Sequence, residues 1–198
     1  TEGTVIQGNG RMLLDVGTAT FATGNEVAIP NLDLSLQATL AGSDTIRGTN
    51  LFNWTGGTIR DVKVVNEHQM RIASGQIFLE DATLENHGTT VWENGYFQLI
   101  HNSLFHNMPG ATFEDRLTAD NYISGGNDGL GAFRNEGSYL KLGNSISIIA
   151  RNFINTGTVD VQAGTLRLAR NGTNTGTLKT NASTTLQISS IYSFTEGT

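Results

Sequence analysis

The most polar, glycine-rich stretch of the chain is the segment 120–131, where acidic and amide side chains stand beside paired glycines. Calcium prefers such oxygen ligands, at about 2.3–2.6 Å. The segment resembles one copy of a calcium-binding Gly-Gly-x-Gly-x-Asp turn, and its candidate ligands are Asp120, Asn127 and Asp128. Because the copy has no counterpart elsewhere in the chain, a plain surface loop is the favoured interpretation and calcium is the alternative.

A second candidate chemistry is cleavage of polysaccharides by the cluster Glu114-Asp115-Arg116. A glycosidase on stacked strands needs two carboxylates at a set separation on one face. The outward carboxylates that the pattern predicts are instead scattered along the chain: Asp61, Glu80, Glu93, Glu114, Asp115 and Asp160. The four histidines also lack the spacing of a metal-binding motif, so solvated surface positions are expected for His68, His87, His101 and His106. We therefore expect no enzymatic activity.

The elements that must position these residues are clearest in the segment 153–168, FINTGTVDVQAGTLRL. Two short strands alternate apolar and polar residues and are separated by glycine turns. Period-two alternation predicts strands with one buried and one solvated face. No part of the chain carries a long apolar stripe with helical spacing, so little or no helix is expected.

An Asn-x-Gly motif recurs through the second half of the chain, with its glycines at positions 88, 110, 137, 157 and 176. A repeat near twenty residues with short strands predicts a β-solenoid, whose turns bury their apolar faces only by stacking. Equivalent asparagines can then form an amide ladder; turn formation through positive φ is the open alternative. The ladder candidates are Asn86, Asn107, Asn135, Asn155 and Asn174.

Composition narrows the class of protein further. The chain has 198 residues, 24 of them Gly and 2 Pro, which suits one turn-rich all-β domain over 1–198. A net charge of −6 without a basic run argues against nucleic acid as a partner. The absence of Cys excludes disulfides and thiolate metal sites. The longest apolar runs are only a few residues, so no transmembrane segment is expected.

The runs FNWTGGTIRD (52–61), IASGQIFLEDATLENHGTTVW (72–92), FRNEGSYLKL (133–142) and FINTGTVDVQAGTLRLARNGTNTGTL (153–178) carry a resemblance. They are similar to repeats of large bacterial surface and secreted proteins of the adhesin or autotransporter-passenger type. That resemblance implies a right-handed parallel β-helix, here of about ten coils. It also implies an extracellular or cell-surface location. This chain departs from the repeats by the insertion near 120–131.

The chain begins and ends with the same four residues, Thr-Glu-Gly-Thr, which favours one superrepeat of a longer chain or fibre. The expected function is a structural or adhesive β-solenoid module that assembles with itself head to tail, either by stacking of its end coils or as tandem covalent repeats. The alternative is a carbohydrate-active enzyme or lectin that binds surface polysaccharide, which exposed aromatic residues would favour: Trp54, Trp92, Tyr96, Tyr122 and Tyr139. An ice-binding solenoid ranks lowest, because no regular Thr-x-Thr array is present.

Overall fold

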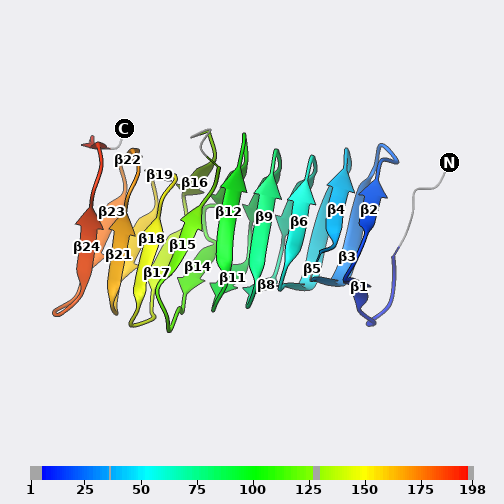
Figure 1. The fold of residues 1–198 in the computed structure, drawn as a ribbon, viewed down its shortest axis with the longest axis horizontal. Coiled ribbons are helices and arrows are strands. Elements are labelled where there is room, and N and C mark those ends of the chain that lie inside the picture. Colours follow the sequence, from blue (N-terminus) through cyan, green and yellow to red (C-terminus); the bar gives the residue numbers. More distant parts are fainter. Residues whose placement is uncertain (1–5, 36, 127–129, 196–198) are drawn as a thin grey trace.

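A computed structural model describes residues 6–35, 37–126 and 130–195. These residues form a parallel β-solenoid of about nine turns near 20 residues each, and no helix occurs among them. The turns follow one another along a rod from the N-terminal to the C-terminal end (Figure 1). The prediction of an all-β solenoid is confirmed. The expected number of ten coils is slightly too high, because two turns take more than 20 residues.

The first face of the rod is a nine-stranded parallel sheet within the described residues. Its strands are β2 (Thr18–Phe21), β4 (Thr39–Gly42), β6 (Gly57–Arg60), β9 (Gln76–Glu80), β12 (Tyr96–Ile100), β15 (Asn121–Ser124), β18 (Ile146–Ile149), β21 (Thr165–Leu168) and β24 (Thr185–Ile188). Each turn of the solenoid contributes one of these strands.

Two further faces belong to one larger sheet. The second face contains β7 (Lys63–Asn66), β10 (Thr83–Asn86), β13 (Leu104–Asn107), β16 (Ala132–Asn135), β19 (Asn152–Asn155), β22 (Gly172–Asn174) and β25 (Tyr192–Phe194). The third contains β1 (Met12–Leu14), β8 (Gln69–Ile72), β11 (Thr89–Trp92), β14 (Thr112–Asp115), β17 (Ser138–Lys141), β20 (Thr158–Val161) and β23 (Thr177–Thr180). The long strands β3 (Glu26–Leu34) and β5 (Thr45–Trp54) join the two faces, since β5 pairs with both β7 and β8.

Parallel pairing places equivalent residues of successive turns directly above one another. On the second face Phe105, Phe133 and Phe153 form one inward column, with ring centroids 4.7 Å and 5.6 Å apart. All three side chains are fully buried. Apolar columns of this kind make a continuous core along the rod, and burial of their surface is the main favourable contribution to folding.

Close packing between turns requires the glycine of the Asn-x-Gly motif at positions 88, 137, 157 and 176, whereas Gly110, in the lengthened copy, has open space around it and a positive φ of 83°. A Cβ atom at Gly157 would lie 2.1 Å from the carbonyl oxygen of Gly137. A Cβ atom at Gly176 would lie 2.1 Å from the carbonyl oxygen of Gly157. Because each corner rests on the backbone of the corner before it, no larger residue fits at these positions.

The middle of the rod interrupts this regularity. On the first face Phe97 pairs with Ile123 and Ile123 with Ile149, so two consecutive turns take 26 residues each. The insertion loop expected at 120–131 is therefore shorter than predicted, since its first part is the regular strand β15. In this strand Asn121 and Ile123 are buried and Tyr122 is exposed.

We expect Val161→Asp to destabilise the domain far more than Asp160→Val. Val161 is fully buried on β20, whereas the adjacent Asp160 points outward and accepts a hydrogen bond from Gln162 Nε2 at 3.0 Å. A second buried carboxylate at position 161, beside a Lys141 that Asp115 already engages, costs about 3–5 kcal/mol, and the surface change costs within about 0.5 kcal/mol. Urea denaturation monitored by circular dichroism measures both. Equal effects would contradict the alternation of buried and solvated faces.

Candidate functional site

The five asparagines that the sequence predicts as a ladder lie at the last inward position of successive strands on the second face. Each side-chain amide donates from Nδ2 to Oδ1 of the next asparagine. The distances are 2.8 Å from Asn86 to Asn107, 2.7 Å from Asn107 to Asn135, 2.7 Å from Asn135 to Asn155 and 2.6 Å from Asn155 to Asn174. None of the five has a positive φ, so the left-handed backbone is not what selects Asn there.

The second amide proton of the ladder residues is also used. Nδ2 of Asn86 donates to the carbonyl oxygen of Thr112 at 3.0 Å, and Nδ2 of Asn135 donates to that of Thr158 at 3.0 Å. Each side chain thereby links its own turn to the backbone of the next turn. Buried polar groups are tolerated in a core when their hydrogen bonds are made, as they are here.

The ladder begins one turn earlier than the sequence indicated. Nδ2 of Asn66 donates to Oδ1 of Asn86 at 2.6 Å, although Asn66 lacks the Gly two residues later that marks the motif. The spacing of twenty residues between Asn66 and Asn86 was the signal in the sequence that could have identified Asn66 as a ladder residue. One turn before Asn66 the same position is held by Gly48. As a result, the buried Oδ1 of Asn66 has no hydrogen-bond partner among the described residues.

The calcium candidates are not brought together by any described contact. Oδ1 of Asp120 accepts a hydrogen bond from the backbone N–H of Ile146 at 2.8 Å. Asn127 and Asp128 lie outside the described residues. Within the described ranges, no three His, Asp or Glu side chains are arranged to hold a metal ion.

The charged residues considered for catalysis are engaged in ion pairs. His106 Nε2 lies 3.2 Å from Glu136, and His101 Nδ1 lies 3.1 Å from Asp81; each is an ion pair only when the imidazole is protonated. Arg116 pairs with Glu114 at 2.7 Å. Surface pairs of this kind link neighbouring turns or flank a strand end, and each contributes little stability on its own.

Asp115 is the exception, and its predicted outward position is wrong. Its side chain is fully buried, because alternation from the inward Phe113 places residue 115 on the same side of β14. Lys141, one turn later, is also fully buried, and its Nζ lies 3.6 Å from Oδ1 of Asp115. Tyr139 donates from its hydroxyl to Oδ2 of Asp115 at 2.8 Å. The core therefore contains one ionic cluster in the middle of the rod.

Burial shifts the titration of this cluster. It raises the pKa of Asp115, against the opposing attraction of the Lys141 charge. It also lowers the pKa of Lys141 and raises that of Tyr139 well above its usual value. All three shifts favour the uncharged forms, as expected for groups in a low-dielectric interior.

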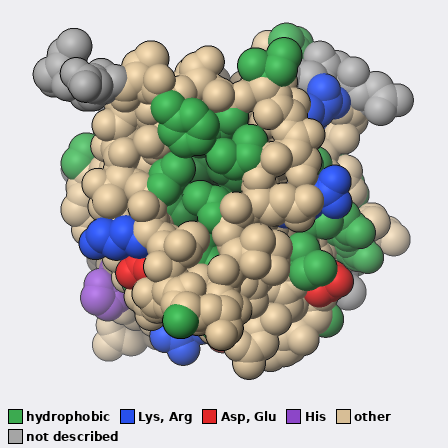
Figure 2. Space-filling model, turned by 90° about the vertical axis from the view of Figure 1, so that its left-hand side faces the viewer, with side chains coloured by type: hydrophobic (Ala, Val, Ile, Leu, Met, Phe, Trp, Pro, Cys, Tyr) green, Lys and Arg blue, Asp and Glu red, His purple; other side chains and the backbone are tan. Residues whose placement is uncertain are grey.

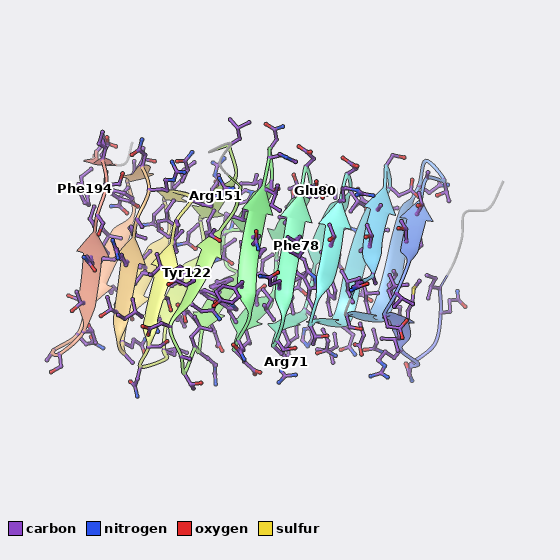
Figure 3. The ribbon with its side chains drawn as sticks, viewed as in Figure 1. Arg71, Phe78, Glu80, Tyr122, Arg151 and Phe194 are labelled. Carbon is purple, nitrogen blue, oxygen red and sulfur yellow. The ribbon has the colours of Figure 1, made fainter. Side chains whose placement is uncertain are left out.

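Of the five aromatic residues proposed for a carbohydrate surface, three are core residues. Trp54, Trp92 and Tyr139 are fully buried. Tyr96 and Tyr122 are 45% and 39% exposed on the first face, with stacked rings 5.9 Å apart. Figure 3 shows Tyr122 on this face near the middle of the rod.

A hollow of about 440 Å³ lies beside this tyrosine pair, at the corner between the first and third faces. Three consecutive corners of the solenoid line the hollow. The last of these corners is longer than the other two and forms one side of the hollow. Its lining combines one aromatic ring with amide and carboxylate groups from Gln76, Asn94, Tyr96, Asp120 and Asn121.

The C-terminal end of the rod exposes apolar side chains. Ile191 is 75% and Phe194 58% exposed, and Ile188 is exposed where the equivalent Leu168 is fully buried. Figure 2 looks onto this end and shows hydrophobic side chains gathered at its centre. Within the described residues, β23, β24 and β25 each pair with a neighbouring turn on one side only.

Comparisons with protein-family models, with curated proteins and with solved structures each found no match. The chain is a β-solenoid repeat protein of about nine turns, and its likeness to bacterial surface repeats rests on the sequence motifs alone. No helix in the described part of the chain is long and apolar enough to cross a membrane.

We expect Gly48→Asn to stabilise the domain by extending the ladder. A side chain fits there, because the nearest atom to a Cβ at position 48 is 3.6 Å away, and the new amide can donate to the unpartnered Oδ1 of Asn66. One such hydrogen bond contributes about 1 kcal/mol. Gly48→Ala is the matched control, since it adds the Cβ without the amide. Equal unfolding free energies for the two variants in urea titrations would show that no rung has formed.

Proposed function

We propose that this domain is a structural and adhesive module of a bacterial extracellular fibre, filament or surface adhesin. The observation that carries the proposal is the apolar surface of the last described turn, which a further turn, of the same chain or of a second copy, would cover. Every internal turn covers the apolar residues of the turn before it, but Ile188, Ile191 and Phe194 are left exposed. Strand edges without a partner and exposed apolar surface both favour association.

The proposed occupant of this end is the first turn of a second copy of the module. The N-terminal end offers the complementary edge, since β1 and β2 also pair on one side only within the described residues. Met12, Leu14 and Ala19 pack against the core there and stay partly exposed. Such a contact joins unlike ends, so it is heterologous and generates an open filament. The role is carried by shape and stacking and requires no catalysis.

We expect residues 1–198 to associate into rods whose mass rises with protein concentration. Ile191→Asp places a charge on the apolar end and is expected to weaken association at least tenfold, the effect of about 1.4 kcal/mol. Ile146→Asp is the matched control, because Ile146 is 40% exposed on the first face, away from both ends. Sedimentation velocity over a concentration series measures the effect. A monomer at every concentration, or an equal loss in both variants, would refute stacking through this end.

The hollow beside Tyr96 supports a second candidate function, the binding of neutral polysaccharide. An aromatic ring packs against the C–H face of a sugar. Amide N–H groups donate hydrogen bonds to the sugar hydroxyls, and amide and carboxylate oxygens accept hydrogen bonds from them. Gln76, Asn94 and Asp120 supply those groups here. An adhesive module could use this hollow to hold a surface glycan while its ends form the fibre.

We expect Tyr96→Ala to reduce binding to neutral polysaccharide by about tenfold, because the ring supplies the main apolar contact. Affinity electrophoresis through gels that contain dextran, glucomannan or soluble chitin derivatives measures the retardation. Gln187→Ala is the control, since Gln187 is exposed on β24 of the same face, four turns along the rod from Tyr96. Migration of the unmodified protein that no polysaccharide changes would eliminate this candidate.

A further inference from the structure

The ionic cluster interrupts a column of the core that is otherwise apolar. On the third face the last inward positions of successive strands are Trp54, Ile72, Trp92, Asp115, Lys141 and Val161. Replacing a buried ion pair by apolar residues is often neutral or stabilising, because removing two charges from water is costly. The two opposite charges in consecutive turns therefore have no obvious advantage in stability over apolar residues at the same positions.

Geometry holds the two side chains in a reactive arrangement. β14 and β17 are neighbouring parallel strands, and Asp115 and Lys141 are direct partners in their register. Parallel strands lie about 4.8 Å apart, which the lysine side chain spans easily. Nζ of Lys141 lies 3.6 Å from Oδ1 of Asp115 and is oriented by donating to the carbonyl oxygen of Gly143. The reacting atoms are Nζ and the Cγ atom bonded to Oδ1, and a side-chain movement that turns Nζ from Oδ1 toward Cγ gives the near-attack arrangement.

Tyr139 and Leu117 complete the surroundings of the carboxyl group. The hydroxyl of Tyr139 donates to Oδ2 at 2.8 Å, and the backbone N–H of Leu117 lies 3.3 Å from Oδ1. Because burial raises the pKa of Tyr139, its hydroxyl stays protonated and remains a donor at neutral pH. Donors fixed on a carboxyl oxygen in a dry site stabilise negative charge that develops there during an attack on the carbon.

We propose that Lys141 and Asp115 condense into an isopeptide bond that joins two neighbouring turns of the rod. A proton passes from the ammonium group to the carboxylate, which gives an amine and a carboxylic acid. The amine lone pair forms a bond to Cγ, and the negative charge that develops on Oδ2 is held by Tyr139. The bond from Cγ to Oδ1 then breaks, and Oδ1 leaves as one water molecule with the acid proton and one amine proton. No oxidant, reductant or further reactant is required.

The surroundings favour this reaction in three ways. Burial shifts the pKa of Asp115 upward and that of Lys141 downward, and both shifts lower the free-energy cost of forming the neutral pair that reacts. An amide also replaces two buried charges by one neutral group, which removes their desolvation cost. Both side chains are fully buried, so little water is present to reverse the condensation once the product water has diffused out.

The bond would clamp the rod at its least regular part. The turn that it closes runs from Asp115 to Lys141, contains β15 and takes 26 residues instead of about 20. A covalent link there would keep two turns together when the rod is pulled. This use of the bond rests on the proposed function, whereas the bond itself can be tested without it.

The deciding experiment is the intact mass of residues 1–198, unfolded in guanidinium before mass spectrometry. We expect a mass lower than that of the sequence by one water molecule, and a tryptic peptide in which the segments around Asp115 and Lys141 are joined. A protein at its full sequence mass would overturn the proposal. The measurement is independent of association, so its failure and the failure of the fibre proposal are separate results.

A cyclic imide formed at Asp115 with its own backbone would also remove one water molecule, and the controls exclude it. Lys141→Met keeps the length and apolar stem of the side chain but removes the amine, so we expect its full sequence mass. Loss of water from this variant would overturn the proposal. Hydroxylamine opens an imide to a hydroxamic acid and leaves an isopeptide intact, so a gain in mass of one hydroxylamine molecule by the unmodified protein would also overturn it.

Discussion

Hydrogen bonding between the backbones of successive turns is the constraint on which the rest of the structure depends. Parallel pairing in constant register repeats every side chain at the same place in the next turn, about 4.8 Å along the rod. A residue type that packs well on its own kind is then favoured at that place in turn after turn. Phe105, Phe133 and Phe153 form such a column, as do Gly137, Gly157 and Gly176.

This constraint explains which features the sequence could predict. Alternation and the Asn-x-Gly spacing are properties of every turn, so the repeated strands and the positions of the ladder residues could be read from them. Asn66 was missed because its motif lacks the Gly. Trp54 and Trp92 were taken for exposed aromatics, although alternation from Phe52 and Thr90 places both inside. The part of the site that depends on irregular turns, such as the hollow beside Tyr96, has no periodic signal and could not be predicted.

The core contains two polar arrangements that follow different physical rules. An amide carries both donors and an acceptor, so each asparagine can bind the one before it and the one after it, and the column can grow without limit. A carboxylate only accepts and an ammonium group only donates, so neither repeats as a column of its own kind, and Asp115 and Lys141 form a single couple between Trp92 and Val161. The ladder is therefore a property of the repeat, and the ionic couple marks one particular pair of turns.

The limits of the ladder indicate what kind of contact a stacked neighbour would make. The column of asparagines is closed by Gly48 at one end and by Phe194 at the other. At the C-terminal end, Nδ2 of Asn174 donates to the carbonyl oxygen of Gly176 within its own turn. A neighbouring turn would therefore meet Phe194 and Ile191 rather than an amide that waits for a partner. Association through this end would be driven by burial of apolar surface and by pairing of strand edges. Association of this kind would consequently tolerate side-chain changes at the junction that would break an amide ladder.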